Sequence, residues 1–98
     1  MAKREPLSRD EIDEALLELP GWRFEEDRLK KRFELENFRA AISFIVRLSF
    51  EAEQLDHHPE LRNVYSTVDV SLTTHVAGDR VSAMDVELAK AIEGFTWV

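Results

Sequence analysis

The chain has 98 residues and no cysteine, so a disulfide framework, a thiol nucleophile and a cysteine-ligated zinc site are excluded. Hydrophobic residues make up 44% of it and the formal net charge at pH 7 is −7, which disfavours nucleic acid and anionic membrane surfaces as partners. This length and composition are typical of one globular domain, residues 1–98.

The N-terminal segment is polar and is followed by the first predicted helix. Residues 1–9 lack the apolar core of a secretory signal, and no apolar run approaches the roughly 18 residues of a membrane span. We therefore expect a cytoplasmic protein. Ser8 and Glu11 have capping-box spacing, and the apolar residues after them predict a helix over residues 9–18, ended by a Pro-Gly pair.

Two hairpins are predicted, one on each side of a long helix. Residues 22–25 and 29–35 alternate between apolar and polar side chains around a polar turn. Residues 61–65 and 68–75 form the second pair. The period of two in the last of these strands places His75 with the polar side chains and not in the core.

The longest predicted helix follows Asn37, which can cap it, and carries one apolar stripe over about five turns. Pro59 disfavours helical geometry at His58, so this helix should end near His57. Glu53 and His57 would then lie one turn apart on the same face, within reach of each other.

The last predicted helix begins at Ser82 and Asp85, which have capping-box spacing with Asp in place of Glu, and ends at Gly94. Phe95, Trp97 and Val98 are apolar and are expected to pack on the core or on another subunit. The order helix, two strands, long helix, two strands, helix predicts an α+β fold, in which three helices cover one face of a four-stranded antiparallel sheet. The other face would carry Asp69, Ser71 and Thr73.

The three histidines, His57, His58 and His75, are the strongest candidates for chemistry. The unperturbed pKa of histidine, about 6.5, lets it give or take a proton near neutral pH, so nearby carboxylates suggest general acid–base catalysis. A metal site is an alternative, because neutral imidazoles are common ligands, although no His-x-x-x-His spacing occurs. A solvated helix end without a catalytic role is a third interpretation of the adjacent pair.

The histidines belong to a longer pattern, Glu53, three residues, His57-His58-Pro59, and then Tyr65, His75 and Asp85. Four further runs accompany it, Gly21-Trp22, Phe33-x-Leu35-x-x-Phe38, Asn63-Val64-Tyr65 and Asp85-Val86-Glu87-Leu88-Ala89. Together, over about residues 19–92, these motifs resemble the pterin-4a-carbinolamine dehydratase family. The sequence departs from the family pattern in a loop at residues 78–81 that is one residue longer than expected, and at Leu35 and Leu61, where an aromatic residue is frequent.

The resemblance implies a reaction. Members of the family it resembles dehydrate 4a-hydroxytetrahydrobiopterin to quinonoid dihydrobiopterin, a step of tetrahydrobiopterin recycling, without a metal or another cofactor. By resemblance, His57 and His75 form the acid–base pair and His58 mainly holds the pterin. Glu53 would orient or charge-stabilise His57 across one helical turn, and Asp85 would orient His75 or simply start its helix.

The resemblance also implies a homodimer or homotetramer that acts on a small-molecule pterin. Animal members of the family it resembles also act as dimerisation partners of a transcription factor, so a non-catalytic protein-interaction module is the alternative function. A sheet edge and the apolar residues 95–98 are the expected contact surfaces between subunits.

Overall fold

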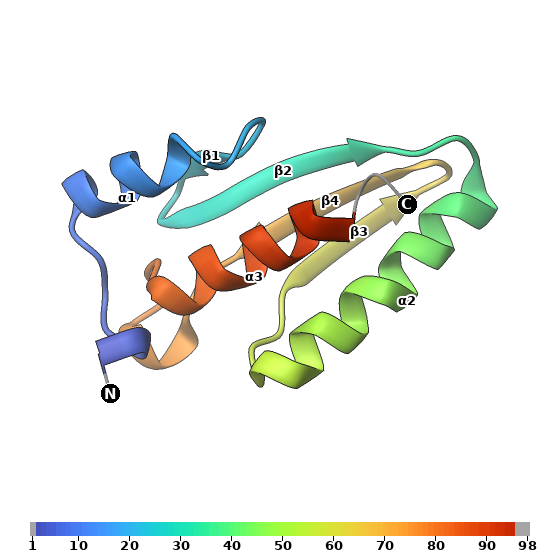
Figure 1. The fold of residues 1–98 in the computed structure, drawn as a ribbon. Helices are drawn as coiled ribbons and strands as arrows, with labels where there is room; N and C mark the ends of the chain where they lie inside the picture. The colour runs from blue at the N-terminus through green and yellow to red at the C-terminus, as the bar shows by residue number, and fades with distance from the viewer. Residues whose placement is uncertain (1, 96–98) are drawn as a thin grey trace.

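A four-stranded antiparallel sheet with helices on one face forms the fold (Figure 1). The computed structural model describes residues 2–95. Its elements in chain order are η1 (Ala2–Arg4), α1 (Arg9–Leu16), β1 (Arg23–Glu25), β2 (Arg28–Glu34), α2 (Phe38–Leu55), β3 (Glu60–Val64), β4 (Thr67–Leu72), η2 (His75–Ala77) and α3 (Ala83–Phe95). The predicted α+β class, with three helices on one face of the sheet, is confirmed. Within the described part of the chain, no helix is long and apolar enough to cross a membrane.

The core lies between the sheet and the two longer helices. The strands are ordered β1-β2-β4-β3, so the two hairpins meet along β2 and β4. Phe33 pairs with Val68 and Leu29 with Leu72, which places these apolar side chains on one face. α2 and α3 contact each other, and each large apolar side chain buried in this core contributes roughly 1.5–3 kcal/mol. The core residues of the sheet and these helices are Leu29, Phe33, Ala41, Phe44, Leu48, Ala52, Val68, Val70, Leu72, Leu88, Ala89 and Ile92.

The opposite face of the sheet is polar, as the alternation predicts. Asp69 lies opposite Arg32 on β2 and Arg62 on β3. The Arg32 guanidinium donates to both carboxylate oxygens of Asp69, at 2.7 and 3.2 Å. These hydrogen bonds, together with the charge of the same guanidinium, lower the pKa of Asp69 against the opposing effect of burial. Ser71, two residues along β4, accepts a hydrogen bond from Arg28.

The predicted ends of the first helix and of the second hairpin differ slightly from the structure. α1 begins with the predicted capping box, in which the Ser8 hydroxyl accepts from the Glu11 backbone and the Glu11 carboxylate accepts from the Ser8 backbone. It ends at Leu16, before residue 18. β4 ends at Leu72, before residue 75, because the chain leaves the sheet and Thr74 instead forms an isolated bridge across the following loop.

The C-terminal helix is longer than predicted. α3 does not end at Gly94 but continues to Phe95, whose ring packs 5.6 Å from the ring of Phe44 on α2. Phe95 is buried, so it contributes to the core, as one of the two predictions for the apolar C-terminal residues proposed. The rest of that segment, residues 96–98, lies outside the described residues.

Candidate active site

The end of α2 separates the two adjacent histidines. The helix ends at Leu55, two residues before His57 and close to the predicted end, because Asp56 adopts the left-handed conformation (φ 52°, ψ 45°). The backbone amide of His57 still donates to the carbonyl of Ala52, at 3.0 Å. This turn directs His57 into the protein, where it is only 6% exposed, whereas the side chain of His58 is 63% exposed.

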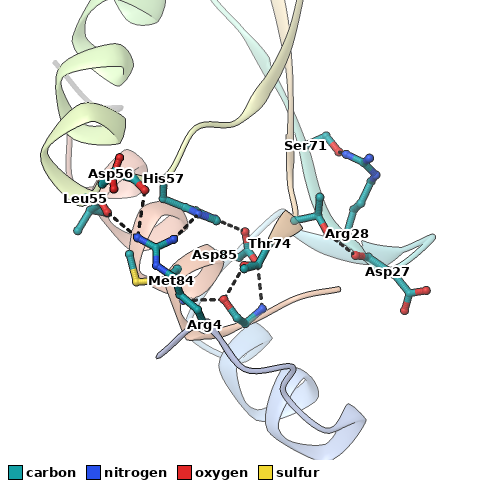
Figure 2. Close-up of polar contacts among 12 residues, drawn as sticks. Arg4, Asp27, Arg28, Leu55, Asp56, His57, Ser71, Thr74, Met84 and Asp85 are labelled. Atoms are coloured by element: carbon teal, nitrogen blue, oxygen red, sulfur yellow. Dashed lines mark hydrogen bonds and ion pairs between the residues drawn. The ribbon is translucent and has the colours of Figure 1, made fainter. Parts of the chain in front are cut away.

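His57 forms a buried pair with Asp85 of α3. Its Nε2 lies 2.6 Å from Oδ1 of Asp85, which is fully buried (Figure 2). A carboxylate only accepts hydrogen bonds, so the imidazole donates from Nε2. Asp85 therefore fixes the orientation of the His57 ring. Nδ1 is the ring nitrogen that takes no part in this buried hydrogen bond.

The other oxygen of Asp85 is held by a chain of hydroxyl groups. Oδ2 accepts from the Ser82 backbone amide at 2.9 Å and from the Thr74 hydroxyl at 2.8 Å. Because the Thr74 proton is used in this way, the Ser82 hydroxyl donates to Thr74, at 2.5 Å, and itself accepts from the Met84 amide. All of these groups are buried, and no buried polar side-chain atom among the described residues lacks a hydrogen-bond partner. The carboxylate is therefore rigidly positioned.

Asp85 thus has both a capping and an orienting role. The predicted contact with the Ser82 backbone at the start of α3 is present. The prediction that Asp85 orients His75 is wrong, because its free oxygen binds His57. The cause is burial, since Asp85 points into the core while His75 lies on the surface.

Glu53 pairs with a different histidine from the one predicted. Its carboxylate lies 3.0 Å from Nε2 of His58, and it does not contact His57. The one-turn spacing would join Glu53 to His57 only if the helix continued, and the left-handed turn at Asp56 ends it first. Both members of the observed pair are exposed, so its contribution to stability is small.

His75 occupies the start of η2, outside the sheet, and its side chain is 93% exposed, which agrees with its predicted place among the polar residues. Its Nδ1 lies 3.0 Å from the carboxylate of Asp79, four residues further along. Asp79 has a positive φ of 59° and belongs to the loop that is one residue longer than expected. Each of the three histidines therefore has its own carboxylate partner, but only the pair made by His57 is buried.

The three histidines line one hollow of about 240 Å³, together with Arg4, Asp56, Thr73, Thr74 and Val76. Wider hollows of about 470 and 520 Å³ lie elsewhere and contain no histidine. Tyr65 is not at this site, since it lies in the turn before β4 whereas the site follows the other end of that strand. Among residues 2–95, no three His, Asp or Glu side chains are grouped in the way that a metal site requires.

Three residues of this site were not found from the sequence. Asp79 was detectable, because it has the same four-residue spacing to a histidine that singled out Glu53. Thr74 gave only the weak signal of being next to His75. Arg4 gave none, because it comes from the polar N-terminal segment and reaches the site only through the tertiary fold, where its side chain lies against the end of α2 (Figure 2).

The chain is similar to known proteins over almost its whole length. The model of the family described as pterin 4 alpha carbinolamine dehydratase matches residues 5–95. A protein of Opitutus terrae provisionally named pterin-4-alpha-carbinolamine dehydratase is 51% identical over 92 residues, which cover 94% of this chain and 95% of that protein. A protein of Mesorhizobium japonicum with the same provisional name is 46% identical, with coverage of 94% and 95%.

A solved structure has the same fold. The crystal structure of a transcriptional coactivator/pterin dehydratase from Brucella melitensis superimposes with a TM-score of 0.87 at 34% sequence identity. The match covers 92% of this chain and 97% of that one.

Proposed function

The chain belongs to the pterin-4a-carbinolamine dehydratase family, and we propose that it dehydrates 4a-hydroxytetrahydrobiopterin to quinonoid dihydrobiopterin, a step of tetrahydrobiopterin recycling. The single observation that carries this proposal is the buried His57–Asp85 pair, which adjoins a hollow shared with two exposed histidines. An oriented, buried imidazole beside two exposed ones is suited to a reaction that consists of two proton transfers.

The reaction needs a proton delivered to the leaving hydroxyl and a proton removed from a ring nitrogen. The carbon–oxygen bond breaks, water leaves, and a carbon–nitrogen double bond forms in the pterin ring. No electron is gained or lost, so no redox group is required. Groups that titrate near neutral pH serve both transfers, because they can donate and accept without a large change in free energy.

We assign His57 and His75 as the acid–base pair and His58 as the residue that holds the pterin. Asp85 orients His57, through the 2.6 Å contact. Glu53, at 3.0 Å from His58, orients the pterin-holding histidine and not the catalytic one. His75, whose only close partner among the contacts described above is the exposed Asp79, is free to approach the substrate.

A homodimer or homotetramer is part of the proposal. Four apolar side chains of α2 are exposed at a spacing of four residues, Phe38, Ile42, Val46 and Phe50. An apolar stripe of this size on a surface helix marks a protein contact. An antiparallel copy of α2 centred on Val46 would place Phe50 opposite Ile42 and Glu53 opposite Arg39, so apolar residues would face apolar ones and opposite charges would face each other.

A protein-interaction role is the second candidate. The Brucella melitensis structure carries both coactivator and dehydratase in its name. The exposed stripe on α2 would serve a different protein as well as a second copy. In this alternative the site would be inactive and a stable complex with another protein would form.

The cytoplasmic location expected from the sequence stays a prediction, which cell fractionation would test.

A stopped-flow ultraviolet assay tests the proposed function. The decay of 4a-hydroxytetrahydropterin would be followed with and without the protein, after chelation and elemental analysis for bound metal. Faster decay with metal-free protein is the expected result. Decay at the uncatalysed rate with folded protein, together with capture of a stable protein partner, would favour the interaction module. Activity that disappears on chelation and returns with a stoichiometric ion would instead favour the metal site.

A further inference from the structure

The N-terminal segment is attached to the active site. η1 lies against α3, where Lys3 forms an ion pair with Glu87 at 3.2 Å. The backbone amide of Leu7 donates to the carbonyl of Val81 at 2.8 Å. These contacts fix the backbone on both sides of Arg4, which precedes the 5–95 range that the family model matches. The half-buried side chain of Arg4 therefore occupies a defined place beside the site.

The guanidinium of Arg4 lies between the end of α2 and the ring of His57 (Figure 2). Nη2 donates to the carbonyl of Asp56 at 3.1 Å and to that of Leu55 at 3.4 Å. These carbonyls belong to the end of a helix, where backbone acceptors lack partners within the helix. Nη1 lies 3.5 Å from Nδ1 of His57, on the side of the ring away from Asp85.

The hydrogen-bond donors and acceptors around His57 determine which of its ring nitrogens carries a proton. A guanidinium has only N–H donors, so His57 can accept from Arg4 only through an unprotonated Nδ1. A carboxylate has only acceptors, so the proton of the neutral ring is on Nε2, toward Asp85. A second proton on Nδ1 would place two N–H groups and two positive charges against each other. The contact with Arg4 therefore favours the neutral ring, with its proton on Nε2.

Resting on the proposed function, we propose that Arg4 is a positioning residue that keeps His57 neutral, with the lone pair of Nδ1 toward the hollow, so that His57 is the base of the reaction. His75 is then the acid. The 3.5 Å contact is the longest of the three that Arg4 makes, so the substrate nitrogen can replace it while both carbonyl contacts keep the guanidinium in place.

The charges around His57 act in opposite directions. Asp85 from α3 favours the doubly protonated ring, and Arg4 from η1 disfavours it. His58 and His75 line the same hollow, and each is paired with its own carboxylate, Glu53 and Asp79 respectively. Arg4 is thus the permanently charged cation among the residues that line the hollow. Without it, no fixed positive charge counters the effect of Asp85, which favours the doubly protonated His57 ring.

The test measures the protonation of the His57 ring in the free protein. Long-range proton–nitrogen correlation spectra report whether each ring nitrogen carries a proton, and a variant lacking both other histidines (His58→Ala with His75→Ala) assigns the His57 signals. The variants to compare are Arg4→Gln, which removes the charge, and Arg4→Lys, which keeps it. Lys3→Gln is the matched control, because it removes a cation from the same turn without contact to His57.

We expect the neutral ring to carry its proton on Nε2, and we expect Arg4→Gln to bind the second proton at a higher pH than the wild type does, because a cation facing Nδ1 has been removed. Arg4→Lys and Lys3→Gln should titrate close to the wild type. Turnover by Arg4→Gln should fall at neutral pH and recover at higher pH. If Arg4 only capped the end of α2, its replacement would lower the melting temperature and leave the protonation of the His57 ring unchanged.

A proton on Nδ1 of the neutral ring in the wild-type protein, or equal midpoints in Arg4→Gln and Lys3→Gln, would overturn the assignment. The spectra need no substrate, so they separate this inference from the proposed function. A shifted midpoint in a protein without dehydratase activity would retain the role of Arg4 toward His57 and reject the reaction. The position of the proton on the neutral His57 ring is measured in the wild-type protein. That measurement can contradict the assignment even if one of the variants folds poorly.

Discussion

The imidazole of His57 and the carboxylate of Asp85 lie 2.6 Å apart, although 28 positions separate them in the sequence. One residue follows the end of α2 and the other lies in the first turn of α3. The packing of these two helices therefore builds the pair, and the Thr74 hydroxyl and the Ser82 backbone amide hold the carboxylate in place.

Replacement of Asp85 by Asn should damage both catalysis and stability. The buried pair loses its charge and the fixed acceptor for Nε2, so we expect turnover to fall by about 10²-fold or more. The free energy of unfolding should fall by about 1.5–3 kcal/mol, the usual contribution of a hydrogen bond to a charged group. Steady-state kinetics and urea denaturation measure the two effects.

The control for this variant is Asp79→Asn, which changes the exposed carboxylate paired with His75. Its stability should match that of the wild type within about 0.5 kcal/mol. Equal losses of stability in the two variants would mean that burial does not distinguish the two histidine–carboxylate pairs.

The fold could be predicted from the sequence because local patterns of residues specify its helices and strands. The alternation in β4 and the apolar stripe of α2 are periodic signals, and the Ser8–Glu11 box is a local hydrogen-bond motif. These signals predicted the two hairpins, the antiparallel sheet and the order of helices and strands along the chain. They are less informative about where an element ends, because a single left-handed residue such as Asp56 stops a helix without a strong sequence signature.

The carboxylate partners of the histidines were harder to predict from the sequence than the histidines themselves. His57, His58 and His75 share one hollow, as the family pattern implies. Glu53 was assigned to His57 because the two are one helical turn apart, but α2 ends at Leu55 and Glu53 pairs with His58 instead. Contacts over long sequence separations, such as those of Asp85 and of Arg4, depend on tertiary packing and leave no local pattern.

His75→Ala should remove most of the turnover and leave the fold unchanged. The side chain is 93% exposed, so its removal should change the free energy of unfolding by less than about 0.5 kcal/mol. We expect kcat to fall by about 10²-fold or more, since one of the two proton transfers loses its group. In a parallel His58→Ala variant the larger effect should be on KM. A kcat for His75→Ala near that of the wild type would contradict its assignment.

The Arg32–Asp69 pair should make stability depend on pH in the acid range. The pKa of Asp69 is lowered in the folded state, so the pair stabilises the protein above the unfolded-state pKa of about 3.9 and is lost as the pH falls through the folded-state value. Asp69→Asn should therefore be less stable than the wild type at pH near 7, by less than about 1 kcal/mol because the pair is partly exposed. Denaturation at acid pH, where the wild-type carboxyl is also protonated, should show that difference shrinking. A constant difference would contradict the assignment.

The apolar stripe of α2 should determine the oligomeric state. Phe50→Glu places a charge in a contact between apolar surfaces, so the oligomer should dissociate into smaller species. Leu17→Glu is the matched control, because Leu17 is also apolar and 85% exposed but lies beyond the end of α1. Sedimentation velocity measures both. An unchanged mass for Phe50→Glu would place the subunit contact elsewhere.

The most direct test of the central claim is the rate of 4a-hydroxytetrahydropterin dehydration by wild-type protein and by His57→Ala, both freed of metal by chelation. Circular dichroism would first establish that the variant is folded. The proposal predicts that the wild type accelerates the decay and that His57→Ala leaves it at the uncatalysed rate. Equal acceleration by the two proteins would show that the buried His57–Asp85 pair does not carry the chemistry.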